Sequence, residues 1–400
     1  MRIFNSFSGI NVIKEILRHE RCAEYVFECF PPDFLKEVVR PYSDIKSELK
    51  TFSGIGDKNP SETVAKVSRA SLREEIVHSV KKKVFENNLP YIHLSYYPMG
   101  YRTICAFRVD CDVTDRASFF NLLNHAEKHE LPMTWFIDVA SQESYMKEVA
   151  SIRKAGHDIQ LHCYNHVTYG NYRKNEKNIR KGKDLMEASG IPVSGFVSPF
   201  GQWNPSLNKV LEDMEFQYSS EFAIGYDDLP FYPFFNRHIS SVLQIPIHPI
   251  CIGSLRNAGF MPHEMIAYFD KIINMKYERR NPILFYGHPR NEIDRYPETI
   301  DFVFSSIKNL QEIWFTTFTE YSAWWQRRLK VEFSVSIEDD ILRIVTDNTD
   351  PAFALHIEKS DSTQAVLPLS DQTTSLSKLD WSVKESILSA PTYEFGILPS

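Results

Sequence analysis

The sequence predicts an α/β protein with a (β/α) barrel at its centre, followed by a small β domain. Between Thr103 and Leu329, short apolar runs alternate with amphipathic segments of roughly ten to fifteen residues, as in parallel βαβ units. After Leu329, short alternating runs are separated by Asp, Asn, Pro and Ser, which is typical of antiparallel strands. The first quarter of the chain has a helical pattern instead.

That first quarter is predicted to be a helical N-terminal extension, residues 1–98. Apolar residues recur at three- and four-residue steps from Ile10 to about Tyr42, interrupted at Pro31-Pro32. Residues 61–85 are again helical in composition, with Ser61 and Thr63 as starting caps. No motif that carries chemistry appears in this part.

Residues 99–328 are predicted to form the barrel, with a boundary near Arg327. Gly156 is expected to end one of its helices, because glycine commonly follows the last helical residue. The predicted strands cover 103–113, 132–140, 157–166, 194–204, 216–224 and 282–288, and the predicted helices cover 117–131, 145–156, 175–190, 207–214 and 263–275, before a last helix that ends near Leu329.

Residues 329–400 are predicted to form a small sandwich-like β domain, with strands over 331–338, 341–347, 353–359 and 363–369. Oligomeric state cannot be inferred from these patterns.

Composition excludes several classes of function. The net charge of -7 argues against a nucleic-acid partner, because phosphate backbones require a basic surface. No segment approaches the roughly 20 apolar residues that span a membrane. The first 22 residues carry charges too early for a secretory signal, so we expect a cytoplasmic protein. The six cysteines form no CxxC pair and are expected to be reduced thiols.

Two carboxylates end the first predicted barrel strand. Arg108, Asp110 and Asp112 occupy alternate positions of the sequence, and residues at alternate positions of a strand share one face. Burying two carboxylates together is costly unless a cation or a catalytic role compensates. A pair of capping aspartates at a strand–helix turn is the structural alternative.

Two histidines follow at the end of the third predicted strand. His162 and His166, four residues apart, would lie close enough on one helical turn to share a metal ion. A carboxylate on the same rim would complete three protein ligands and leave a position for water. Cys111 should face away from the aspartates and pack in the core, whereas the sequence leaves Cys163 undecided.

Two further clusters end later strands. In SPFGQWN, Pro199 and Gly201 mark a sharp turn, which is also compatible with a purely structural role. His288 follows the apolar run PILFY at a late strand. A histidine on that rim is suited to be a general acid, because its pKa lies near the working pH. A histidine hydrogen-bonded to loop backbone is the alternative.

The order Asp-X-Asp, HxxxH, a strand ending in Pro-Phe-Gly and a late strand ending in His resembles the polysaccharide deacetylase (NodB-homology, carbohydrate esterase family 4) group. The resemblance covers roughly Thr103 to Arg327. The RVDCD form is more similar to members that act on sugar–lipid or O-antigen intermediates, including the deformylase of the aminoarabinose lipid pathway. The family resemblance implies a distorted (β/α)7 barrel that holds one divalent metal ion, usually zinc.

Carried over by position, the resemblance implies Asp110 as general base, Asp112, His162 and His166 as metal ligands, and His288 as general acid. The segment of Pro199, Phe200, Gly201 and Trp203 would contact the substrate, with a backbone N–H near Phe200 holding the oxyanion. Because Cys111 separates two aspartates that are usually adjacent, the division of roles between them stays open.

One departure concerns the arginine that braces the catalytic aspartate in the family. Val197 occupies its position here, and Arg108 or Arg290 are the candidate replacements. The family's partner of the acid histidine has no clear equivalent either, and Glu221, Asp227 and Asp228 are the candidates.

The function predicted from the sequence is metal-dependent hydrolysis of the N-acyl (acetyl or formyl) amide of an amino sugar in a surface-polysaccharide or glycolipid precursor. Three alternatives remain: an amidase of another non-peptide C–N bond, a catalytically silent carbohydrate-binding protein, and a metal-dependent glycosidase. The glycosidase is disfavoured because it requires two well-separated carboxylates, not one tight pair.

Overall fold

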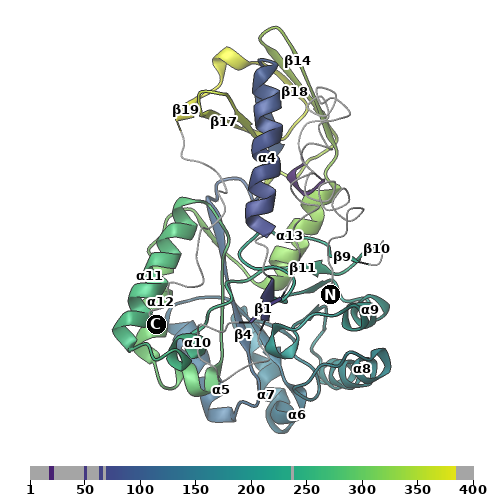
Figure 1. Cartoon of the computed structure of the whole chain (residues 1–400), viewed down its shortest axis with the longest axis vertical. Helices are drawn as coiled ribbons and strands as arrows, with labels where there is room; N and C mark the ends of the chain where they lie inside the picture. The colour runs from purple at the N-terminus through teal and green to yellow at the C-terminus, as the bar shows by residue number, and fades with distance from the viewer. Residues whose placement is uncertain (1–17, 22–48, 52–62, 66–68, 236–237, 384–400) are drawn as a thin grey trace.

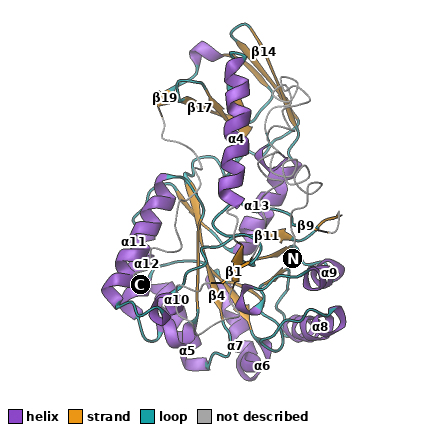
Figure 2. Ribbon diagram, viewed as in Figure 1, coloured by secondary structure: helices purple, strands orange, loops and turns teal. Residues whose placement is uncertain are grey.

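The computed structural model describes residues 18–21, 49–51, 63–65, 69–235 and 238–383. In the view of Figure 1, a parallel sheet flanked by helices fills the lower part, and two small sheets with the long helix α4 (Arg69–Glu86) lie above it. Figure 2 shows the helices on the outside of the lower sheet. Among the described residues, no helix has the length and apolar character needed to cross a bilayer.

The lower sheet confirms the predicted parallel α/β barrel. Its strands run in the order β11-β8-β7-β6-β5-β4-β12, and β13 also pairs with β4; every one of these pairs is parallel. The strands are β4 (Thr103–Asp110), β5 (Met133–Ile137), β6 (Asp158–Leu161), β7 (Gly195–Phe196), β8 (Tyr218–Ser219), β11 (Leu243–Gln244), β12 (Ile283–Gly287) and β13 (Ile313–Phe315).

The sheet curls but does not close with a continuous ladder. No strand pairing joins its two ends, β11 and β12, among the described residues. The chain just after β11 meets β12 through a hydrogen bond from the His248 N–H to the Leu284 carbonyl oxygen, 2.8 Å long. This incomplete closure is the distortion that the sequence resemblance implied.

Alternation along β4 decides which side chains enter the barrel. Ile104 and Ala106 belong to the apolar cluster inside the curled sheet, whereas Phe107, Val109 and Cys111 belong to the cluster between the sheet and its helices. Arg108 therefore projects inward with the first set, since side chains two apart share a face. The prediction that Cys111 packs in the core, away from the aspartates, is confirmed, and Cys163 is buried in the same outer cluster.

Helices follow most of the barrel strands. They are α5 (Arg116–Lys128), α6 (Val139–Gln142), α7 (Met146–Ser151), α8 (Tyr172–Ala188), α9 (Pro205–Asp213), α10 (Ile252–Asn257), α11 (Pro262–Glu278), α12 (Pro297–Lys308) and α13 (Phe318–Lys330). Asp115, Asn171 and Asn204 cap three of them through side-chain oxygens that accept backbone N–H groups of the first turn.

The helix predicted over 145–156 is instead three short pieces, η2 (Glu143–Tyr145), α7 and η3 (Ile152–Ala155). Gly156 ends the series with φ 86°, a left-handed conformation that glycine adopts without strain, so the predicted stop is confirmed.

Two antiparallel sheets form the upper part of the molecule. One contains β14 (Phe333–Glu338), β15 (Ile341–Thr346) and β18 (Gln372–Ser375), and the other contains β16 (Ala354–Glu358), β17 (Thr363–Pro368), β19 (Ser382–Val383) and β3 (Tyr91–Leu94). The predicted C-terminal β strands are therefore present. Residues 91–94 correct the prediction of a purely helical first quarter, because they form an edge of this sheet next to β16.

The rest of the N-terminal part is described only in pieces. Helix α4 covers most of the helix predicted over 61–85, but Thr63–Ala65 form β2, which pairs with β1 (Leu49–Thr51). Almost all of the helix predicted from Ile10 to Tyr42 lies outside the described residues. A short hairpin of β9 (Phe234–Phe235) and β10 (His238–Ile239) completes the strands.

Candidate active site and metal centre

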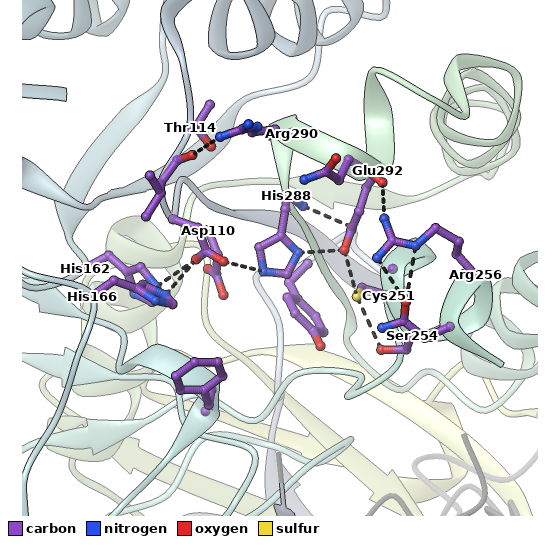
Figure 3. Close-up of a pocket in the computed structure, with 18 of the residues that line it drawn as sticks. Asp110, Thr114, His162, His166, Cys251, Ser254, Arg256, His288, Arg290 and Glu292 are labelled. Carbon is purple, nitrogen blue, oxygen red and sulfur yellow. Dashed lines mark hydrogen bonds and ion pairs between the residues drawn. The ribbon is translucent and has the colours of Figure 1, made fainter. Parts of the chain in front are cut away.

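A cavity of ≈330 Å³ opens where the carboxyl ends of the barrel strands meet. Of the residues singled out in the sequence, eight line it: Asp110, Asp112, His162, His166, Phe200, Gly201, His288 and Arg290. Figure 3 shows His162 and His166 on one side of Asp110 and His288 on the other. Residues distant in sequence are thus brought together by strand ends, as the barrel pattern predicted.

Three side chains converge on one point of this cavity. Asp112 Oδ1 lies 3.1 Å from His162 Nε2 and 3.0 Å from His166 Nε2, and the two histidine nitrogens are 3.1 Å apart. Ligands about 2.0–2.1 Å from a tetrahedral ion lie about 3.3 Å from one another, so this triangle is close to a zinc-sized face. Within the described residues, these three form one of two groups that could hold a metal ion.

Hydrogen bonding at His162 shows why a cation fits between the three groups. Its Nδ1 lies 2.8 Å from the carbonyl oxygen of Val197 and must donate to it, because a carbonyl only accepts. With Nδ1 as the donor, the lone pair of Nε2 is directed at Asp112 and His166. A carboxylate oxygen and a ring lone pair at this separation repel unless a proton or a metal ion lies between them.

Asp112 reaches this point from a turn, not from a strand. Strand β4 ends at Asp110, and Asp112 has φ 24°, so the two carboxylates do not share a strand face as the sequence predicted. The fully buried amide of Gln142 holds the turn: its Nε2 donates to the carbonyl oxygens of Cys111 (3.2 Å) and Asp112 (3.0 Å). Ser141 adds a 3.0 Å hydrogen bond to the Asp112 carbonyl.

The two histidines lie in a loop, not on the helical turn that their spacing suggested. Cys163 between them has φ 67°, and this left-handed residue turns the chain so that both rings face Asp112. Asn178 of α8 fixes the loop, because its side chain accepts from the Asn165 N–H (2.9 Å) and donates to the carbonyls of Asn165 and Val167 (2.9 Å each).

Asp110 is paired with Arg108 inside the barrel. The Arg108 Nε donates to Asp110 Oδ1 at 2.6 Å and its Nη2 donates to Oδ2, and the guanidinium is completely buried. Arg290 does not reach Asp110, because its half-exposed side chain turns away and donates to the Val113 carbonyl at 3.3 Å. Of the two candidate bracing arginines, the structure thus brings only Arg108 to the aspartate.

His288 has a partner that the sequence reasoning missed. Its Nδ1 lies 2.7 Å from Glu292 Oε1, and its backbone N–H donates to Glu292 Oε2 at 3.1 Å. Its other nitrogen, Nε2, faces Asp112 Oδ2 at 3.6 Å. Although burial disfavours a charged ring, the two carboxylates outweigh it and hold the pKa of His288 well above its usual value.

The three partners proposed for His288 from the sequence are wrong. Glu221 accepts from Ser198 and Ser219, Asp227 pairs with His248 and Lys276, and Asp228 pairs with Arg73. Each is buried and already satisfied by its own partners.

The sequence signal that could have identified Glu292 as the partner of His288 was their separation of four residues. It was hidden because the intervening chain is not an α-helix but the η5 turn (Pro289–Ile293), in which Asn291 has φ 64°.

The turn after β7 contributes one exposed aromatic ring. Phe200 has φ 61° in η4 (Pro199–Gly201), and its ring lies edge-on to His166, 5.3 Å between centroids. Gly201, with φ 58°, packs so closely on Phe222 that a Cβ would lie 2.3 Å from its ring. Pro199 and Trp203, which were predicted to contact the substrate, do not line the cavity. Trp203 lies just before α9, and its ring packs on Phe235 instead.

Comparisons with known proteins relate part of the chain to polysaccharide deacetylases. Residues 110–219 match the sequence profile of the polysaccharide deacetylase family. Over this segment, the chain is similar to that family. The peptidoglycan deacetylase of Helicobacter pylori (strain ATCC 700392 / 26695) is 27% identical over 114 residues, which is 28% of this chain and 39% of the relative. The match therefore spans about two-fifths of the curated relative.

One solved structure shares the fold of part of this chain. Puue allantoinase is 16% identical, with a TM-score of 0.51, and the match covers 58% of this chain and 93% of the allantoinase chain. A probable polysaccharide deacetylase from Pseudomonas aeruginosa PAO1 is also 16% identical over the same shares, with a TM-score of 0.49.

Proposed function

We propose that this protein is a metal-dependent hydrolase of the N-acyl amide, acetyl or formyl, of an amino sugar in a surface-polysaccharide or glycolipid precursor. The observation that carries the proposal is the convergence of Asp112, His162 and His166 within 3.0–3.1 Å of one another beside the Arg108–Asp110 pair. The match to the polysaccharide deacetylase family supports the same chemistry. That the protein works in the cytoplasm stays a prediction.

The three converging groups fit a zinc ion. Two imidazoles and one carboxylate are a common set of protein ligands for zinc, and all three residues line the cavity. When bound there, a divalent ion would polarise the acyl carbonyl and make a water molecule a stronger nucleophile. Val197 and Gln142 would hold its ligands in place, the first through His162 and the second through the Asp112 turn.

Asp110 is the proposed general base. Its carboxylate lines the cavity, and Arg108 binds both of its oxygens. The fixed geometry directs the carboxylate at the space beside Asp112, where it would accept the proton of the attacking water. The structure thus favours the division of roles in which Asp112 is the ligand and Asp110 the base.

His288 is the proposed general acid. Glu292 and Asp112 favour its protonated form, so a proton is available at Nε2, on the side that faces the cavity. Donation of that proton to the amide nitrogen lets the amine leave, which it cannot do as an anion. A backbone N–H of the Phe200 turn would stabilise the oxyanion, as the family resemblance implies.

The silent sugar-binding alternative is less consistent with these contacts. A binding protein does not require a buried arginine on one aspartate and a charged histidine 3.6 Å from the other. Both features suit proton transfer, which supports the hydrolase proposal.

Release of acetate or formate from N-acyl amino sugars and their conjugates tests the proposal. Turnover is expected in the zinc-loaded protein and is expected to fall at least about 10²-fold in Asp110→Asn and in His288→Gln, since each removes a proton-transfer group. His238→Gln, an exposed histidine outside the cavity, is the matched control. Turnover that survives both substitutions would contradict the assigned roles.

A further inference from the structure

One wall of the cavity carries positive charge that the proposed reaction does not use. Arg256 from α10 and Arg290 from η5 line it, and within the described part of the chain no lysine does. Figure 3 shows Arg256 and Ser254 on the opposite side of His288 from the histidine pair, and Arg290 beside Thr114 at the upper edge of the cavity. A substrate bound at the reacting centre would extend past these side chains.

The carboxylates of the cavity are already matched by other groups. Asp110 is bound by Arg108, Glu292 pairs with His288, and Asp112 faces the two histidines with which it would share an ion. The charge of the two rim arginines is therefore not needed to neutralise any of them.

Arg256 and Arg290 instead contact neutral oxygens. Arg256 donates to Asn257 Oδ1 at 3.0 Å and to the Asn291 carbonyl at 2.6 Å. Arg290 donates to a backbone carbonyl, and its ion-pair contact within the described residues is to Asp115 at 4.0 Å, between two half-exposed side chains. Such an exposed pair neutralises little charge. This wall is locally cationic in a chain whose net charge is -7.

The donors of this wall suit an anion with several oxygens. A guanidinium has five N–H groups, and Arg256 uses three of them on Asn257 and Asn291. The amide oxygen of Asn257 is occupied by Arg256, so its NH₂ is the remaining polar end, and the Ser254 hydroxyl lies on the same helix. Donors that arrive from α10 and η5 in different directions match a tetrahedral phosphoryl group better than a planar carboxylate.

We propose that the wall formed by Arg256, Asn257, Ser254 and Arg290 binds a phosphoryl group carried by the substrate. The substrate class would then be a phosphorylated N-acyl amino sugar, either a sugar phosphate or a phosphodiester-linked sugar. The sugar half of this inference rests on the proposed function, but the anion site does not. Phe200 and Phe222 line the cavity as apolar surface against which the sugar ring would pack.

Binding of matched probes tests the site without turnover. N-acetylglucosamine and N-acetylglucosamine 1-phosphate differ by one phosphoryl group, and their dissociation constants are measured by titration calorimetry. A bound metal ion would itself attract phosphate, so the measurement is made on metal-free protein. Two metal-free samples are used independently: the variant His162→Ala/His166→Ala, and wild-type protein in the presence of a chelator. The comparison is repeated in Arg256→Gln/Arg290→Gln, with the exposed Arg295→Gln as matched control.

The phosphorylated sugar is expected to bind about 10- to 100-fold more tightly than the neutral sugar, as for hydrogen bonds to a charged group. This advantage should be lost in Arg256→Gln/Arg290→Gln and kept in Arg295→Gln. In UDP-N-acetylglucosamine a diphosphate links the sugar to a nucleoside. Tighter binding of this probe than of the 1-phosphate would indicate a linked sugar as the substrate, and weaker binding would indicate a free sugar phosphate. Equal affinity for the two matched probes, no measurable binding of the phosphorylated one, or an advantage that survives the double substitution would overturn the inference.

The two proposals fail separately. If the protein hydrolyses the amide but does not prefer the phosphorylated sugar, only the proposal of the anion site is refuted. A phosphoryl preference in a protein that hydrolyses no N-acyl sugar, neutral or phosphorylated, would remove only the proposed reaction.

Discussion

Gln142 is expected to control metal affinity although it touches no ligand atom. Its amide is fully buried and donates to the carbonyls of Cys111 and Asp112, which holds Asp112 at φ 24°. Gln142→Met keeps the length of the side chain and removes both hydrogen bonds. At about 0.5–1.5 kcal/mol each, their loss costs about 1–3 kcal/mol. If that cost falls on the turn, affinity drops about 5- to 150-fold, comparable to other residues that orient metal ligands.

Competition with a chromophoric zinc chelator measures this affinity directly, and a thermal melt of the same samples measures the fold. Gln217→Met, at an exposed glutamine outside the cavity, is the matched control. The reasoning is refuted if Gln142→Met lowers the melting temperature but leaves the zinc dissociation constant within about twofold of wild type, because Gln142 would then be only a structural residue.

Three other predictions follow from the buried charges around the site. Glu292→Gln should move the alkaline limb of the pH–kcat profile to lower pH, because Glu292 helps to raise the pKa of His288 and the acid must be protonated; an unchanged limb would contradict the pairing. Arg108→Met should lower stability by about 3–5 kcal/mol by leaving Asp110 without its cation, and Arg108→Met/Asp110→Asn should recover part of the lost melting temperature; identical melts of the two variants would refute this. Burial raises the pKa of Glu221 to about 7, against the opposing effect of Arg108. The folded state therefore keeps a proton that the unfolded state releases above pH ~4.5, so the stability of the fold falls as the pH rises toward 7. Glu221→Gln should flatten this pH dependence in thermal melts at pH 5 to 8.

The barrel and the cluster of ligands could be predicted because both depend on simple periodicities. Alternating apolar and amphipathic segments indicated βαβ units, and polar residues at strand ends indicated one rim. The alternation along β4 was sufficient to place Arg108 with Asp110 and Cys111 on the other side. These inferences required no knowledge of the loops.

Loop conformations explain what could not be predicted. The Asp112 turn, the histidine loop and the η5 turn each contain a non-glycine residue with positive φ, which sequence patterns do not reveal. These residues are Asp112, Cys163 and Asn291, and they bring Gln142 and Glu292 into contact with the site. The pairing of Tyr91–Leu94 with β16 was equally hidden, because it joins strands about 260 residues apart.

Spacing alone would also not have distinguished the metal site from a second histidine pair. His125 lies in the last turn of α5 and His129 is its C-cap residue, and each lies 2.9 Å from Asp301 Oδ1. Lys128 donates to the other oxygen of Asp301 at 2.8 Å, so this carboxylate already has a cation. The pair lies on the outer helices and does not line the cavity. It therefore provides a matched control for the proposed metal-binding pair.

Metal content tests the central claim most directly. Elemental analysis is made on wild-type protein, on His162→Ala/His166→Ala and on His125→Ala/His129→Ala, each after reconstitution with zinc and removal of excess ion. We predict one equivalent of zinc in the wild type and in the His125/His129 variant, and none in the His162/His166 variant. No zinc in the wild type, or the same content in all three, would contradict a metal centre at Asp112, His162 and His166.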